Sequence, residues 1–251
     1  TLTPTPTPTP THNPPTHTHG PLYPSAPFSY AQVPAGRTIQ TIYPKAYADE
    51  VSIFDFNMRP GPSLFPRPDC TDPSAGCQLG TNPGRTYRFY TGTPVVPFGY
   101  GLSYTTFTYQ LTQPPTRVSL APLAGLLAKS TAAAGFIRTS DERAAGPATE
   151  FQVQVTNTGA RDADDVVLGF LTPPDAGKHG APLKSLFAFE RIHVAAGATV
   201  SVTLYPTFTD LTAVTAGGAR VARPGEYTVS FGVGEAARHG MGFVTHRFVA
   251  E

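Results

Sequence analysis

Hydrophobic and polar residues alternate along several short segments in the second half of the chain. Residues 150–156, Glu-Phe-Gln-Val-Gln-Val-Thr, follow a strict period of two, and residues 198–204 and 224–233 alternate in the same way. Successive side chains of a β-strand point to opposite faces of a sheet, so this pattern predicts strands with one buried face. The complete set of predicted strands is residues 103–111, 150–156, 165–171, 182–192, 198–204, 224–233 and 243–249. Short strands of this number, separated by turns, indicate an immunoglobulin-like β-sandwich.

The first part of the chain, residues 1–34, has no such alternation and begins with a Thr-Pro repeat. Proline fixes φ and lacks an amide donor, which disfavours helix and inner strand and leaves polyproline II as the expected conformation. Threonine with proline is also the composition of O-glycosylated stalks, and the chain has no Asn-X-Ser/Thr sequon. The candidate positions for O-glycosylation or another tail modification are Thr3, Thr5, Thr7, Thr9 and Thr11. The alternative is a flexible linker.

The region between the tail and the predicted sandwich, residues 35–95, has a mixed pattern. Residues 37–43 alternate and predict a strand, and the aromatic run at residues 86–90 predicts another. Residues 61–80 form a Pro-rich insertion. Further along, residues 121–134 are rich in Ala and Leu, which favours a short helix or a padded loop.

Cys70 and Cys77 lie close together in the Pro-rich insertion. A disulfide between them would constrain the unfolded chain by about 2.5 kcal/mol in the loop-entropy treatment. Metal binding is the rival interpretation, but two cysteines without a nearby histidine make a poor zinc site. A disulfide indicates an oxidising environment, so we expect an extracellular, secreted or cell-surface protein.

The charge balance says little about the fold, but it limits the classes of partner that we expect. The chain has 18 basic and 17 acidic residues, a net charge of +1, and no long basic block, which argues against a nucleic-acid partner. No apolar run is long enough to predict a transmembrane helix, so no membrane partner is expected. The chain begins at Thr1 rather than at Met, which indicates a mature or trimmed product.

Three segments of the sequence resemble a known family. Residues 82–109 read NPGRTYRFYTGTPVVPFGYGLSYTTFTY, residues 155–167 read VTNTGARDADDVV, and residues 223–234 read RPGEYTVSFGVG. They resemble glycoside hydrolase family 3, the β-glucosidases and β-xylosidases, at the junction from the α/β sandwich domain to the fibronectin type III-like domain. The resemblance covers residues 37–111 and 150–234.

The resemblance implies a fold class and three domains. The chain is expected to be mainly β, an immunoglobulin/fibronectin type III-like β-sandwich with an extended Thr/Pro-rich N-terminal tail and a small irregular lobe. Residues 1–34 are the tail, residues 35–95 the remnant of the α/β sandwich domain with the Cys70–Cys77 loop, and residues 96–251 the fibronectin type III-like sandwich.

The resemblance also implies that the catalytic residues of the family lie in a domain that this chain does not match. Family 3 enzymes use an Asp nucleophile in a Ser-Asp-Trp type motif on a (β/α)8 barrel, together with an acid/base carboxylate. This sequence contains no Trp, and too few residues precede the junction to form a barrel. We therefore assign no catalytic residue, no cofactor and no metal, and expect the chain not to be an enzyme by itself.

Two groups of side chains remain as candidates for binding. The aromatic residues Tyr87, Tyr90, Tyr100 and Tyr104 could form an interface or stack against sugars, or simply fill the core around the junction. The carboxylates of Asp162, Asp164 and Asp165 could bind calcium, or form a solvated loop before a strand.

Three functions follow as hypotheses. The first is a non-enzymatic, extracellular, self-assembling glycoprotein subunit of filament type, whose partners are other copies of itself through the tail and attached glycans. The second is an accessory C-terminal fragment of a β-xylosidase or β-glucosidase that needs a separate catalytic chain. The third is a carbohydrate-binding module that uses the aromatic junction.

Overall fold

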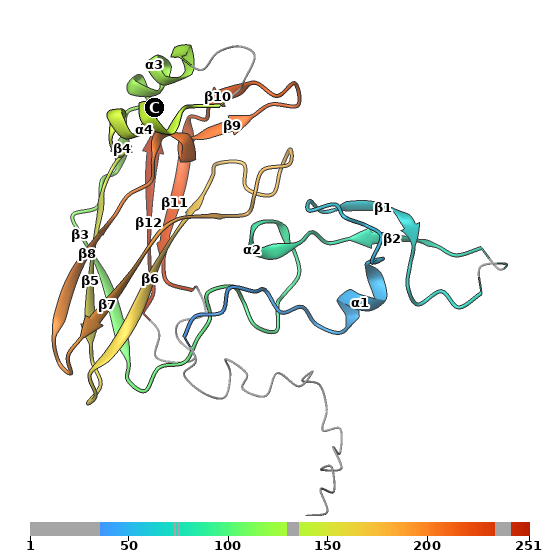
Figure 1. Cartoon of the computed structure of the whole chain (residues 1–251), viewed down its shortest axis with the longest axis horizontal. Helices are drawn as coiled ribbons and strands as arrows, with labels where there is room; N and C mark the ends of the chain where they lie inside the picture. Colours follow the sequence, from blue (N-terminus) through green and yellow to red (C-terminus); the bar gives the residue numbers. More distant parts are fainter. Residues whose placement is uncertain (1–35, 73, 75, 130–135, 234–241) are drawn as a thin grey trace, which may run out of the picture.

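The computed structural model describes residues 36–72, 74, 76–129, 136–233 and 242–251. These residues form a β-sandwich from which a smaller lobe projects to one side (Figure 1). The predicted mainly-β sandwich with a small irregular lobe is therefore confirmed. The predicted tail, with Thr3, Thr5, Thr7, Thr9 and Thr11, lies outside the described residues.

One sheet of the sandwich has five strands in the order β4-β12-β11-β6-β7. All neighbours are antiparallel except β12 and β4, which run parallel through the pairs Val249–Arg117 and Ala250–Val118. The strands are β4 (Arg117–Val118), β6 (Ala163–Thr172), β7 (Ser185–Val194), β11 (Gly225–Phe231) and β12 (Val244–Ala250).

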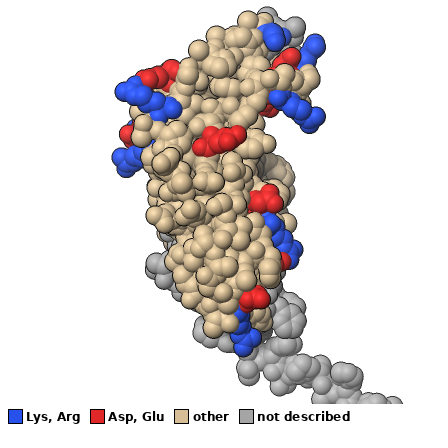
Figure 2. Space-filling model, turned by 90° about the vertical axis from the view of Figure 1, so that its left-hand side faces the viewer, with Lys and Arg blue, Asp and Glu red and all other residues tan. Residues whose placement is uncertain are grey.

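The other sheet has three antiparallel strands in the order β3-β5-β8, namely β3 (Phe107–Thr112), β5 (Phe151–Asn157) and β8 (Thr199–Leu204). Its outward positions are uncharged and polar: Thr108, Gln110, Thr112, Gln152, Gln154, Thr156, Thr199, Ser201 and Thr203. Figure 2 views the molecule from the side away from the lobe and shows charged side chains mostly toward the margins of this face.

The core lies between the two sheets and is rich in aromatic rings. The ring of Phe151 on β5 lies 5.7 Å from that of Phe231 on β11 and 5.8 Å from that of Phe248 on β12, so the two sheets meet through it. Tyr227 stacks on Phe248 at 5.4 Å. Each of these side chains is at most 1% exposed, and burial of rings this large dominates the stabilisation of a core.

The ends of the sandwich carry short elements. Helix α3 (Ala121–Lys129) confirms the helical alternative for the Ala- and Leu-rich segment, and buries Leu123 and Leu126. Helix α4 (Thr139–Ala145) follows, and the 3-10 helix η2 (Phe208–Leu211) leads into a hairpin of β9 (Thr212–Val214) and β10 (Arg220–Ala222). The sequence pattern predicted none of the last four elements.

The lobe contains α1 (Ala46–Glu50), β1 (Gly61–Pro66), β2 (Leu79–Asn82) and α2 (Thr86–Phe89). The Pro-rich insertion is not irregular throughout, because β1 and β2 pair as an antiparallel hairpin. The register shifts between Pro62 and Pro66. Prolines are tolerated here because a two-stranded hairpin leaves outward amide positions that need no partner.

The prediction of an aromatic strand at residues 86–90 is wrong. Asn82 accepts a hydrogen bond from the Gly84 amide at 2.9 Å and donates its side-chain amide to the Asn57 carbonyl at 2.8 Å, which fixes a tight turn. The Tyr90 amide then donates to the Thr86 carbonyl at 2.9 Å, closing one helical turn. The aromatic residues favour a strand by propensity, but the local turn bonds decide the conformation.

The predicted strand at residues 37–43 is also wrong. Only Ile42 forms a β-bridge, with Val96, and Thr38 exchanges backbone bonds with Tyr100 and Gly99. Pro97 lies between these contacts and has no amide to donate, so a continuous ladder cannot form.

The predicted disulfide is present. Cys70 and Cys77 are joined at a Cα–Cα distance of 5.8 Å and close the tip of the β1–β2 hairpin. We expect the double variant Cys70→Ser/Cys77→Ser to destabilise the hairpin by about 2.5 kcal/mol, because the unfolded segment regains its loop entropy. Hydrogen exchange of the β1 and β2 amides measures this loss.

Reduction of the native chain with dithiothreitol should cause the same loss of amide protection. Dithiothreitol should cause no further loss in the serine variant. Equal protection of the hairpin amides in native, reduced and serine forms would contradict the expectation.

Candidate functional site

The junction between lobe and sandwich is built from stacked aromatic rings. Tyr87 on α2 stacks on Phe98 with ring centroids 4.3 Å apart, and both rings meet Phe170 on β6 edge-on, at 5.7 and 6.2 Å. The Tyr87 hydroxyl also accepts a hydrogen bond from the Leu186 amide on β7 at 3.3 Å. Tyr87 therefore attaches the lobe to the five-stranded sheet.

The four tyrosines named from the sequence do not share one face. Tyr100 is 6% exposed and packs with Val96, whereas Tyr104 is 73% exposed. Tyr90 is half-buried and meets Tyr43 edge-on at 4.8 Å. Tyr100 therefore belongs to the core around the junction, and only Tyr87 and Tyr90 line a common cavity.

That cavity has a volume of about 240 Å³ and is also lined by Phe98 and Lys184. The Lys184 ammonium lies 4.6 Å from the centre of the Phe170 ring, and burial lowers the pKa of Lys184. Aromatic walls with one polar group are typical of small-molecule sites. Sugar stacking against Tyr87 and Tyr90 stays a prediction.

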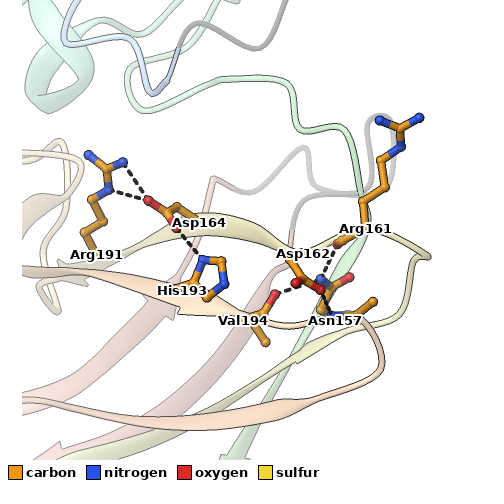
Figure 3. Close-up of polar contacts among 8 residues, drawn as sticks. Asn157, Arg161, Asp162, Asp164, Arg191, His193 and Val194 are labelled. Carbon is orange, nitrogen blue, oxygen red and sulfur yellow. Dashed lines mark hydrogen bonds and ion pairs between the residues drawn. The ribbon is translucent and has the colours of Figure 1, made fainter.

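The acidic turn holds its carboxylates apart. Asp164 accepts a hydrogen bond from Arg191 at 2.6 Å and pairs with His193 at 2.8 Å (Figure 3). Asp162 accepts a hydrogen bond from the Ala196 amide at 2.8 Å. The Asp164 pKa is lowered, first by the hydrogen bond to His193 and then by that to Arg191. Within the described residues, no group of three His, Cys, Asp or Glu could hold a metal ion.

Asp165, next along β6, is buried in a polar contact that ties the start of the lobe to the sandwich. Its carboxylate pairs with Arg37, accepts the Tyr109 hydroxyl at 2.6 Å and accepts the Val166 amide at 2.8 Å. Burial, and then the charge of Asp165, raise the pKa of Tyr109, so its hydroxyl stays protonated and donates. This arrangement is structural, and no local pattern in the sequence indicates that Arg37 is its long-range partner.

Several large apolar side chains of the lobe are exposed. Ile53, Phe54 and Phe56 follow α1 and are 79%, 62% and 83% exposed, while Leu64 on β1 and Leu79 on β2 are 83% and 59% exposed. We call these five residues the lobe apolar surface. Large exposed apolar side chains that are concentrated in one part of a folded protein are candidates for contact with a partner.

No helix in the part of the chain that the structure describes is long and apolar enough to cross a membrane.

Comparison with known proteins defines the class of the sandwich. The model of the fibronectin type III-like domain matches residues 165–234, which include most of β6 and all of β7 to β11. The exo-1,4-β-xylosidase bxlB of Emericella nidulans is 38% identical over 198 residues, covering 78% of this chain and 22% of the xylosidase. β-D-xylosidase 1 of Arabidopsis thaliana is 36% identical over 174 residues, covering 67% of this chain and 20% of that enzyme.

A solved structure shows the same relation. The family 3 exo-β-xylosidase XlnD, in complex with a xylobiose aziridine activity-based probe, superposes with a TM-score of 0.62 and 28% identity, over 86% of this chain and 24% of XlnD. The chain is therefore a homologue of the C-terminal, fibronectin type III-like part of the family 3 β-xylosidases. The described residues do not include a catalytic barrel.

Proposed function

We propose that the chain is the accessory C-terminal module of a β-xylosidase- or β-glucosidase-like hydrolase and docks on the portion that bears the catalytic barrel. That portion is either a separate chain or another part of a longer protein. The lobe apolar surface is the observation that carries this proposal. The chain spans 22% and 20% of two similar xylosidases, so most of what such a lobe would contact lies outside these 251 residues.

The energetics of the lobe support docking. Burying one large apolar side chain is worth about 1.5–3 kcal/mol relative to leaving it exposed. All five side chains are more than half exposed, so a partner that covers them would remove a large apolar area from water. In this proposal the module contributes no catalytic group, and glycoside cleavage is carried out by carboxylates of the partner portion.

The environment proposed is extracellular. The disulfide between Cys70 and Cys77 supports an oxidising compartment. The self-assembling alternative depends on Thr3 to Thr11 of the tail, which lie outside the described residues, and it remains a prediction.

The proposal is tested by docking onto a defined partner. The probe is the Emericella nidulans xylosidase produced without the segment homologous to this chain, mixed with the 251-residue chain and followed by analytical ultracentrifugation. We expect a one-to-one complex, and Phe56→Ser/Leu64→Ser should weaken it at least about 100-fold because two large apolar side chains are lost from the interface.

The matched control is Phe189→Ser, which removes a 65% exposed phenylalanine from β7, outside the lobe. It should leave the affinity unchanged. Failure of the native chain to bind, or equal loss of affinity in the control, would contradict the proposal. Large homopolymers of the chain alone would favour self-assembly instead.

A further inference from the structure

A second cavity lies where the lobe meets the sandwich, and basic side chains surround it. Its volume is about 320 Å³. The lobe contributes Arg59 and Arg88, the β6–β7 loop contributes His179, and Arg220 and Arg223 come from β10 and the residues after it. We call this the arginine pocket. Because the net charge of the chain is only +1, the concentration of cations here is local.

Asp210 lines the arginine pocket, and its carboxylate and those of Asp175 and Glu142 are engaged by neighbouring residues. Asp210 accepts the Thr207 amide at 2.8 Å and the Thr207 hydroxyl at 3.0 Å, which caps η2, and burial raises its pKa. Asp175 pairs with Arg223 at 3.0 Å. Glu142 accepts the Thr209 amide at 3.1 Å. These three carboxylates therefore bond to other groups and do not neutralise Arg59 and Arg88.

Arg59 and Arg88 share one aromatic ring. Each guanidinium carbon lies 5.5 Å from the centre of the Phe89 ring, and the Arg59 Nε donates to the Gly180 carbonyl at 2.8 Å. Both side chains are exposed, and within the described residues neither forms an ion pair with a carboxylate. Both guanidinium groups therefore belong to residues that line the pocket, and both are accessible to a ligand.

The loop that faces these arginines is under backbone strain. His179 has φ of 50°, in the left-handed region that non-glycine residues rarely adopt. The turn is held by hydrogen bonds from Lys178 to Asp175 and from Ala181 to Lys178. Such strain is concentrated at binding sites, where it sets a side chain in position. Here it places His179 at the wall of the pocket.

We propose that the arginine pocket binds the carboxylate of an acidic sugar, a uronic acid either free or at the end of an oligosaccharide. A guanidinium group binds a carboxylate through two parallel hydrogen bonds, and two arginines line this pocket from the lobe. The remaining wall includes Phe89, Pro173 and Pro182, whose apolar surfaces suit the C–H face of a sugar ring. The volume fits a small ligand. None of the five residues of the lobe apolar surface lines the pocket, so this site does not depend on the proposed docking.

Isothermal titration of the 251-residue chain tests the proposal, with glucuronic acid, glucose and inorganic phosphate as ligands. We expect glucuronic acid to bind and glucose not to bind. Arg88→Gln and Arg59→Gln should each weaken binding by about tenfold or more, since each removes charge-assisted hydrogen bonds. Binding should also weaken at high salt.

Arg247→Gln is the matched control, because Arg247 is an exposed arginine on β12 paired with Glu226 at 3.6 Å, and it should leave binding unchanged. Circular dichroism melting of each variant checks that the fold persists. Equal affinity for glucose and glucuronic acid, or an Arg88→Gln variant that binds as the native chain does, would overturn the proposal. Phosphate binding as tight as glucuronic acid would overturn the sugar class.

Discussion

Replacing Asp165 by alanine is expected to lower the free energy of unfolding by about 3–5 kcal/mol, as is typical when one partner of a buried ion pair is removed. Asp165 is 5% exposed. Its loss removes the acceptor of the Tyr109 hydroxyl and the partner of the Arg37 guanidinium at the same time. The Tyr109 hydroxyl stays within the packed junction, where a polar group without an acceptor is costly.

Urea denaturation followed by tyrosine fluorescence measures this loss. Asp164→Ala is the matched control, because the neighbouring carboxylate pairs with Arg191 and His193 on the surface. Exposed ion pairs contribute little to stability, because water and salt screen them. Asp165→Asn, which keeps an acceptor for Tyr109, should fall between the two. Similar losses for Asp164→Ala and Asp165→Ala would show that the buried carboxylate has no special role.

Gly84→Ala is expected to be the most damaging single substitution in the lobe. Gly84 has φ of 90°, and a Cβ there would lie 2.1 Å from the Phe89 carbonyl oxygen. The left-handed conformation costs an alanine about 1–2 kcal/mol, and relieving the backbone clash adds about 1–3 kcal/mol. The tight turn at residues 82–84 should therefore open, and helix α2, which follows it, should lose its hydrogen bond.

Hydrogen exchange separates this local effect from loss of the whole fold. Amides of α2 and of the β1–β2 hairpin should lose protection, while those of β5 and β11 keep it. Gly197→Ala is the control, because Gly197 has φ of 73° but nothing within 4 Å of a Cβ. It isolates the conformational cost from the clash. A Gly197→Ala variant as unstable as Gly84→Ala would mean that the clash is relieved without cost.

The sandwich could be predicted from the sequence because its strands have one buried face. The alternation in residues 150–156 and 224–233 is the burial pattern of β5 and β11, in which every second side chain lies in the core. Local patterns of this kind need no knowledge of distant partners.

The polar contact at the junction and the arginine pocket could not be predicted, because each depends on contacts between segments that are distant in the sequence. Arg37 and Asp165 are separated by 128 positions, and the arginine pocket gathers residues from Arg59 to Arg223. The misassigned α2 shows a second limit, since its Tyr and Phe residues favour strands by propensity whereas a turn bond at Asn82 sets a helix. Exposure of Phe56 and Leu64 likewise has no signature in a sequence.

The position of β12 has a consequence for how the chain acquires its structure. Residues 244–250 form the penultimate strand of the five-stranded sheet, between β4 and β11, and Phe248 packs in the core. The sandwich therefore cannot close during synthesis until these residues have left the ribosome. Pairing of β12 with β4 also joins segments more than 120 residues apart, as in Val249 with Arg117, and such non-local pairing slows folding. Until β12 has paired, the edge of β11 is exposed and can pair with other unfolded chains. Slow synthesis or slow folding of this last strand therefore favours aggregation.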